Sequence, residues 1–226
     1  MEKEIKISLP LYKIAYSLCF MLGLSLVRGT AYTCEIGIAL EAPMAILAVV
    51  FLSDTYVQEI AGKRWEVYHL YPLRKRVLSI IKRIGVQECY LLMLSIVGYA
   101  CFRLFQKPAG SDIAQGVGSD QYLFWVYVMA AAVTINFWGI LSNTIASLSG
   151  SMWAGVGGSL LLWICTNSQM GDRILGDFNV FSYTFRSLDK FGNSADFGWL
   201  YGKAVCIVLM ALMLAALPKI LTIKIK

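Results

Sequence analysis

The stretch IGIALEAPMAILAVVFL, residues 36–52, decides the fold class, because Glu41 is its only charged residue. A helix needs about 20 mostly apolar residues, and at least ~17, to cross the hydrocarbon core of a bilayer. The composition of the whole chain agrees, since 58% of its 226 residues are hydrophobic and 15% are charged. About a quarter of the residues are charged in an ordinary soluble domain. We therefore predict a membrane protein.

Similar apolar runs recur along the chain and predict six membrane-spanning helices in one all-α transmembrane domain, residues 1–226. The expected spans are residues 9–27, 36–52, 84–105, 122–148, 152–166 and 198–217. The fifth span is short and rich in glycine at Gly155, Gly157 and Gly158, which predicts a tilted or irregular helix, or close packing on a neighbour. Pro218 is expected to end the sixth span.

The first apolar run has an alternative interpretation as a signal peptide, because Gly29-Thr30-Ala31 offers a small-residue cleavage site. The run is long for a signal peptide, however, and a second span begins almost at once. We therefore expect it to be a span, with Lys13 and Arg28 reaching the two interfaces. The segment between spans five and six, residues 167–197, is expected on the outer side of the membrane. It mixes aromatic and charged residues, and this mixture predicts short helices at the membrane surface.

Basic residues predict the orientation, because cytoplasmic loops carry an excess of Lys and Arg. Six spans place both termini and the segment between spans two and three on one side. That side holds thirteen of the twenty basic residues: Lys3, Lys6, Lys13, Lys63, Arg64, Arg74, Lys75, Arg76, Lys82, Arg83, Lys219, Lys224 and Lys226. We expect a multi-pass protein of the cell membrane with cytoplasmic N- and C-termini.

The most distinctive stretch is YVQEIAGKRWEVYHLYPLRKR, residues 56–76, between spans two and three. Aromatic and aliphatic residues fall near one face at helical spacing: Tyr56, Ile60, Val67 and Tyr71. Pro72 cannot continue this helix but suits the first turn of the next one. The pattern predicts a short amphipathic helix on the inner surface, which binds either anionic lipid headgroups or a cytoplasmic partner.

This order of features resembles the ABC-2 type permeases, the membrane subunits of ATP-binding-cassette transporters. In that family the segment before span three carries an acidic residue, a glycine, a second acidic residue, a proline and an arginine. The matching residues here are Glu59, Gly62, Glu66, Pro72 and Arg74, and Lys82 follows them before span three. The resemblance implies that residues 56–76 form a coupling helix that docks onto an ATPase subunit. The docking residues would be Glu59, Gly62, Trp65, Glu66, Tyr68, Leu70, Pro72 and Arg74.

The same resemblance implies the partners and the activity. Two copies of a cytoplasmic ATPase and a second permease, identical or related, would complete a bacterial exporter in the plasma membrane. ATP and Mg²⁺ are expected on the ATPase, because this chain has no G-x-x-x-x-G-K-[ST] phosphate loop, and no cofactor or metal is expected in the chain itself. Small permeases of this size remove antimicrobial peptides or lipid-like toxins, as lantibiotic self-immunity subunits do. Membrane lipids are further expected partners, and no nucleic-acid partner is expected.

Candidate site residues are the polar groups inside the spans, because a charge at the bilayer centre costs about 2.5–3.5 kcal/mol. Glu41 is expected to line the pathway or hold a cationic substrate, or alternatively to pair with Arg28 or lie near the interface. Glu35 is a weaker pathway candidate, and Glu88 is a candidate near the inner, ATPase-facing side. Two further pathway candidates lie seven residues apart on one face of span four and favour interhelical hydrogen bonds: Asn136 and Asn143.

Catalysis by this chain alone is not expected. His69, the only histidine, falls in the surface segment, and the chain has no G-x-S-x-G motif. None of its six cysteines forms a C-x-x-C pair, so we expect neither a disulfide framework nor a zinc site. Two other functions remain open: a non-transporting scaffold or sensor, and a secondary transporter. The second is disfavoured because no inverted repeat is visible.

Overall fold

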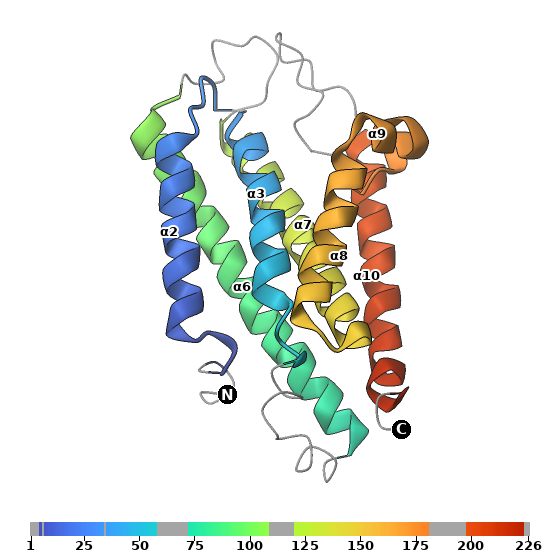
Figure 1. Ribbon diagram of the computed structural model, residues 1–226. Helices are drawn as coiled ribbons and strands as arrows, with labels where there is room; N and C mark the ends of the chain where they lie inside the picture. Colours follow the sequence, from blue (N-terminus) through green and yellow to red (C-terminus); the bar gives the residue numbers. More distant parts are fainter. Residues whose placement is uncertain are drawn as a thin grey trace.

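The computed structural model describes residues 5, 7–33, 35–57, 72–108, 120–180 and 198–223. The regular structure within these ranges is helical, and no strand occurs in them. Figure 1 shows the long helices standing side by side as a bundle, with both chain ends at the same end of it. They are α2 (Leu11–Val27), α3 (Glu35–Leu52), α6 (Leu73–Gln106), α7 (Asp120–Ser149), α8 (Met152–Asn167) and α10 (Gly198–Ile223).

Four of these helices, α3, α6, α7 and α10, are long and apolar enough to cross a membrane. The expectation of an all-α fold is confirmed for the described residues, and these four helices support a membrane protein. Helix α2 has 17 residues and α8 has 16, so both are shorter than these four. The count of six spans stays a prediction.

Helix α6 begins earlier than the predicted span at residue 84. Pro72 has an extended backbone, with φ −60° and ψ 144°, and the helix starts at the next residue, as its proline predicts. With 34 residues and a rise of about 1.5 Å each, α6 is roughly 51 Å long, against ~30 Å of hydrocarbon. Its first turns carry Arg74, Lys75 and Arg76 and extend past the neighbouring helices (Figure 1).

The prediction that Pro218 ends the sixth span is wrong, because α10 continues through this proline to Ile223. A proline removes one backbone hydrogen bond, and helices within a membrane tolerate that loss when packing holds the flanking turns. Leu217 and Ile220 are both buried against the bundle. Pro43 lies inside α3 in the same way.

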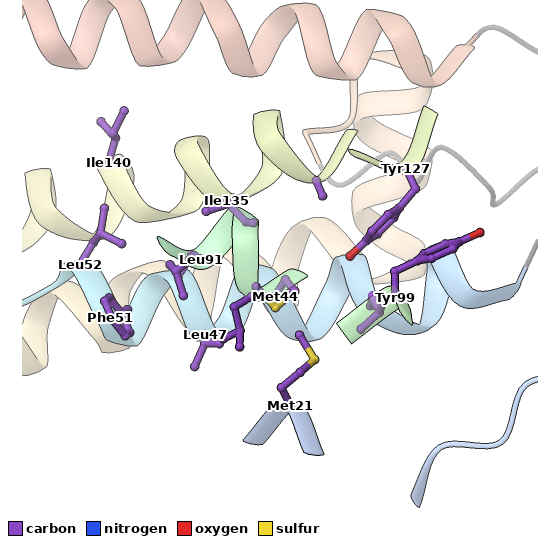
Figure 2. Close-up of a cluster of buried hydrophobic side chains, with 14 of the residues drawn as sticks. Met21, Met44, Leu47, Phe51, Leu52, Leu91, Tyr99, Tyr127, Ile135 and Ile140 are labelled. Atoms are coloured by element: carbon purple, nitrogen blue, oxygen red, sulfur yellow. The ribbon is translucent and has the colours of Figure 1, made fainter. Parts of the chain in front are cut away.

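Helix α3 lies at the centre of the bundle. Of its apolar window, 67% is buried, compared with 22% for α10, which therefore lies at the edge. Figure 2 shows side chains of several helices meeting around α3, among them Met21 from α2, Leu91 from α6 and Ile135 from α7. Small residues such as Ala45 and Ala48 are fully buried in α3 and let its neighbours approach closely.

The glycine-rich helix α8 packs closely on α7, as the sequence predicts. A Cβ on Gly155 would lie 2.6 Å from the Cβ of Ala146 and 2.7 Å from the carbonyl oxygen of Ser142. A Cβ on Gly157 would meet nothing within 4 Å. One glycine is thus required by the α7–α8 contact, whereas the other faces away from it.

Short helices follow α8 at the end of the bundle opposite the termini (Figure 1). They are α9 (Gln169–Leu175) and the 3₁₀ helix η2 (Gly176–Phe178). The Ser168 hydroxyl accepts a hydrogen bond from Gly171 N at 3.1 Å and caps α9. Asn179 Nδ2 donates to the carbonyl of Thr166 at 2.8 Å and holds the turn against α8. Short helices were expected here, and the remainder of that segment, 181–197, lies outside the described residues.

Candidate functional site

A buried charged cluster joins three helices. Lys203 of α10 donates hydrogen bonds to Glu41 Oε1 of α3 and, at 2.6 Å, to Thr134 Oγ1 of α7. The Thr134 hydroxyl in turn donates to Glu41 Oε1 at 2.8 Å. The Lys203 and Glu41 side chains are only 7% and 3% exposed. Two charges removed from water in this way are tolerable only because each is bound by the other and by a hydroxyl.

Glu41 therefore has an internal partner that its sequence neighbourhood does not indicate. Arg28, the expected alternative partner, donates through Nη1 to the carbonyl of Ala39 at 3.2 Å. The second oxygen of Glu41, Oε2, is buried without a hydrogen bond in the part of the chain that the structure describes. Lys203 is not among the thirteen basic residues that the sequence predicts on the cytoplasmic side. Lys203 lies inside the apolar run 198–217, and a lysine in such a run indicates that a carboxylate partner is needed.

A second buried ion pair lies near the other end of α3. Lys13 Nζ of α2 is 2.5 Å from Asp54 Oδ1, 2.7 Å from the carbonyl of Phe51 and 4.9 Å from the centre of the Phe51 ring. The expectation that Lys13 reaches the interface is wrong, because it is only 3% exposed. The end of α3 supplies both a carboxylate and a backbone carbonyl, and a cation is stabilised at a helix C-terminus.

A cavity of about 310 Å³ adjoins this pair. Its lining residues are Tyr12, Lys13, Tyr16, Val50, Asp54, Val57 and Met152. Close by, Thr55 Oγ1 donates to Gln87 Oε1 at 2.8 Å, and Gln87 Nε2 donates to the carbonyl of Ser8 at 2.9 Å. Polar contacts thus join the chain before α2 and the chain after α3 to helix α6, at the end of the bundle that carries the termini.

The other pathway candidates have local roles in the structure. Glu35 Oε2 accepts hydrogen bonds from Ala31 N at 2.7 Å and Tyr32 N at 3.4 Å, so it holds the chain at the start of α3. Asn136 Nδ2 donates to the carbonyl of Ala132 in its own helix at 2.7 Å, and this bond is not interhelical. Asn143 is buried, and its Oδ1 has no hydrogen-bond partner within the described ranges.

The inner-side candidates are only partly described. Glu88 is half-buried in α6, and its Oε1 lacks a hydrogen bond among the residues described. Pro72 and Arg74 are exposed where α6 begins. The remaining docking candidates fall in 58–71, outside the described residues: Glu59, Gly62, Trp65, Glu66, Tyr68 and Leu70.

The chain is thus an all-α bundle with four helices that could cross a membrane, and two of its buried lysines are each paired with a carboxylate inside the bundle. In the described ranges, no three His, Cys, Asp or Glu side chains gather closely enough to hold a metal ion. Comparisons with protein-family models, with curated proteins and with solved structures find no match for this chain.

Proposed function

We propose that this chain is the permease subunit of an ATP-binding-cassette exporter with six spans. It moves a peptide or a lipid-like cargo outward across a bacterial plasma membrane, using ATP hydrolysed by a separate subunit. Two copies of that ATPase bind the cytoplasmic side, where both termini lie. A second permease, identical or related, forms the other half of the pathway.

The observation that supports this proposal best is the placement of the two helices that flank residues 58–71. Helix α3 ends at Leu52, just before the motif segment, and α6 begins directly after Pro72. Helix α6 then continues without a break for 34 residues, along the bundle to its far end (Figure 1). A movement of the segment would pass directly to the central helix and to the longest one.

The buried ion pairs suggest how such a movement would be resisted and transmitted. Helix α3 is bound to α10 through Glu41 and to α2 through Asp54. Displacing α3 therefore strains one contact in its first half and one just beyond its last residue. Packed helices with discrete charge contacts favour two distinct arrangements over continuous deformation. The two arrangements would be the inward- and outward-open states.

An alternative function is a membrane scaffold or sensor that transports nothing. The exposed basic residues at the start of α6, Arg74 and Lys75, favour it, because a basic surface beside a membrane attracts anionic headgroups or an acidic partner. This function needs no ATPase, and that difference separates the two hypotheses.

Purification in mild detergent from the native host tests the proposal. We expect an ATP-binding-cassette subunit in equal stoichiometry, identified by mass spectrometry, together with ATPase activity. An intact and abundant membrane protein without such a subunit would contradict the exporter and support the scaffold.

A variant test addresses the docking segment. The double substitution Glu59→Ala/Glu66→Ala should reduce the recovered ATPase on the order of tenfold, equivalent to about 1.4 kcal/mol of binding. The amount of chain in the membrane should not change. Asp177→Ala is the matched control, because Asp177 is an exposed acid in η2 at the opposite end of the bundle. Equal ATPase recovery from both variants would remove the docking role.

A further inference from the structure

An apolar slot opens between α8 and α10. Both helices pack against α7, but they make few contacts with one another, so α7 forms the floor between two separate walls (Figure 1). The space measures about 380 Å³. Its floor includes Trp138 and Thr144 of α7, and its walls and outer end include Leu162, Thr166, Val180, Leu212 and Ala216.

The slot offers no free polar group to a ligand. Its only hydroxyls belong to two threonines, and both are bound to carbonyls of their own helices. Thr144 Oγ1 donates to Ile140 at 2.7 Å, and Thr166 Oγ1 donates to Leu162 at 2.8 Å. At the outer end, the thiol of Cys206 donates to the carbonyl of Val180 at 3.5 Å. A lipid headgroup or a polar peptide would find no hydrogen-bond partner in the slot, whereas a hydrocarbon chain would contact apolar side chains along its length.

The slot is elongated, and this shape suits a single extended methylene chain. The lining residues run from Thr166 and Val180 at the outer end to Thr144 and Ala216 further along α7 and α10, so the slot follows the helices, as lipid chains do.

We infer that this slot binds one acyl chain of a bilayer phospholipid. Two of the three helices around the slot, α7 and α10, are long and apolar enough to cross a membrane, and the side chains of Leu162 and Leu212 at its mouth are exposed. An empty apolar slot would lose dispersion contacts along both walls and the floor, and a methylene chain restores them. The inference depends on the membrane location alone and is independent of ATP-driven export.

Trp138 is a built-in reporter, because it lies in the floor and is only 1% exposed. In the test, the other tryptophans are replaced by phenylalanine: Trp65, Trp125, Trp153, Trp163 and Trp199. The full-length chain is placed in phosphatidylcholine vesicles whose acyl chains are brominated at mid-chain or left unmodified. Bromine quenches indole fluorescence on close approach. We expect at least a twofold loss of Trp138 emission in the brominated vesicles.

A slot-filling substitution separates a bound chain from the surrounding bilayer. Ala216→Phe places a ring inside the slot and should reduce the quenching at least twofold. Ala204→Phe is the matched control on α10, because Ala204 is exposed and is not a lining residue. It should leave the quenching unchanged. Equal quenching in Ala216→Phe, Ala204→Phe and the parent would overturn the inference.

Two further measurements keep the test decisive. If Ala216→Phe does not fold, Leu162→Phe narrows the slot from the opposite, exposed rim and should give the same reduction. Dilution of the protein in the vesicles tests a second copy as the occupant. Quenching that is independent of protein density supports the acyl chain. Quenching that rises on dilution shows displacement of another protein chain and overturns the inference.

Discussion

Two lysines lie inside the bundle, and each is bound by a carboxylate of the α3 region. Lys13 and Lys203 are buried, whereas Arg103 at the end of α6 pairs with Asp120 in the open. Removing one partner of a buried pair leaves an uncompensated charge and costs about 3–5 kcal/mol. An exposed pair is worth ~0–1 kcal/mol, because water screens it. The three pairs should therefore differ strongly in their contribution to stability.

Lys203→Met should destabilise the protein by about 3–5 kcal/mol, because Glu41 keeps a buried charge without its main partner. Adding Glu41→Leu should restore most of the loss, because an apolar pair needs no compensation and Thr134 can bond to its own helix. Unfolding in mixtures of detergent and dodecyl sulfate measures both variants. Arg103→Gln is the control and should change stability by less than ~1 kcal/mol. A double variant as unstable as Lys203→Met would refute this account.

Residue-level predictions from the sequence succeeded unevenly for a physical reason. The sequence marks Glu41 as costly, because a charge stands alone in an apolar run. It does not identify Lys203 as the partner, since the two residues are 162 positions apart and only helix packing brings them together. The same holds for Lys13. Its long side chain favoured a position at the membrane interface, but its hydrogen-bond partners are Asp54 and the carbonyl of Phe51.

The helices illustrate what local sequence can determine. Hydrophobic runs located each long helix, because a membrane requires about 20 apolar residues regardless of tertiary contacts. Two boundaries required packing information. Helix α6 begins at Leu73, where charged residues continue the helix beyond the apolar run, and α10 passes through Pro218 because its last turns are held by the bundle.

The contact of α8 with α7 gives a prediction at the level of the helix. Gly155→Val should destabilise the protein by about 1–3 kcal/mol, because its Cβ would overlap Ala146 and the Ser142 carbonyl. Gly157→Val in the same helix is the control, since a side chain there meets open space. Heat-induced unfolding in detergent distinguishes them. A Gly155 variant as stable as the control would show that α8 is not held by this close approach.

At the scale of the whole molecule, the arrangement of chain ends sets the topology. Both termini and the first turns of α6 lie at one end of the bundle, and α9 and η2 lie at the other (Figure 1). The excess of basic residues on the terminal side predicts that this side is cytoplasmic. The structure shows which segments lie at the same end of the bundle, and the charge distribution predicts which end is cytoplasmic.

Labelling with a membrane-impermeant maleimide tests this topology. In a cysteine-free background, Asp177→Cys should react in intact cells. Arg74→Cys should react only after the cells are permeabilised. Both positions are exposed, so access depends on the side of the membrane. The reverse pattern would invert the orientation, and labelling of both positions in intact cells would contradict a bundle that crosses the membrane.

The contact between Glu41 and Lys203 also constrains biosynthesis. A ribosome that adds about 5–20 residues per second needs roughly 8–32 s to make the 162 residues between them. Throughout that interval α3 is already available for membrane insertion, while the helix that neutralises its carboxylate has not been made. A Glu41 side chain that enters the membrane before α10 needs water or a proton donor beside it until Lys203 arrives. The Glu41 contact is therefore complete only once α10 has been added.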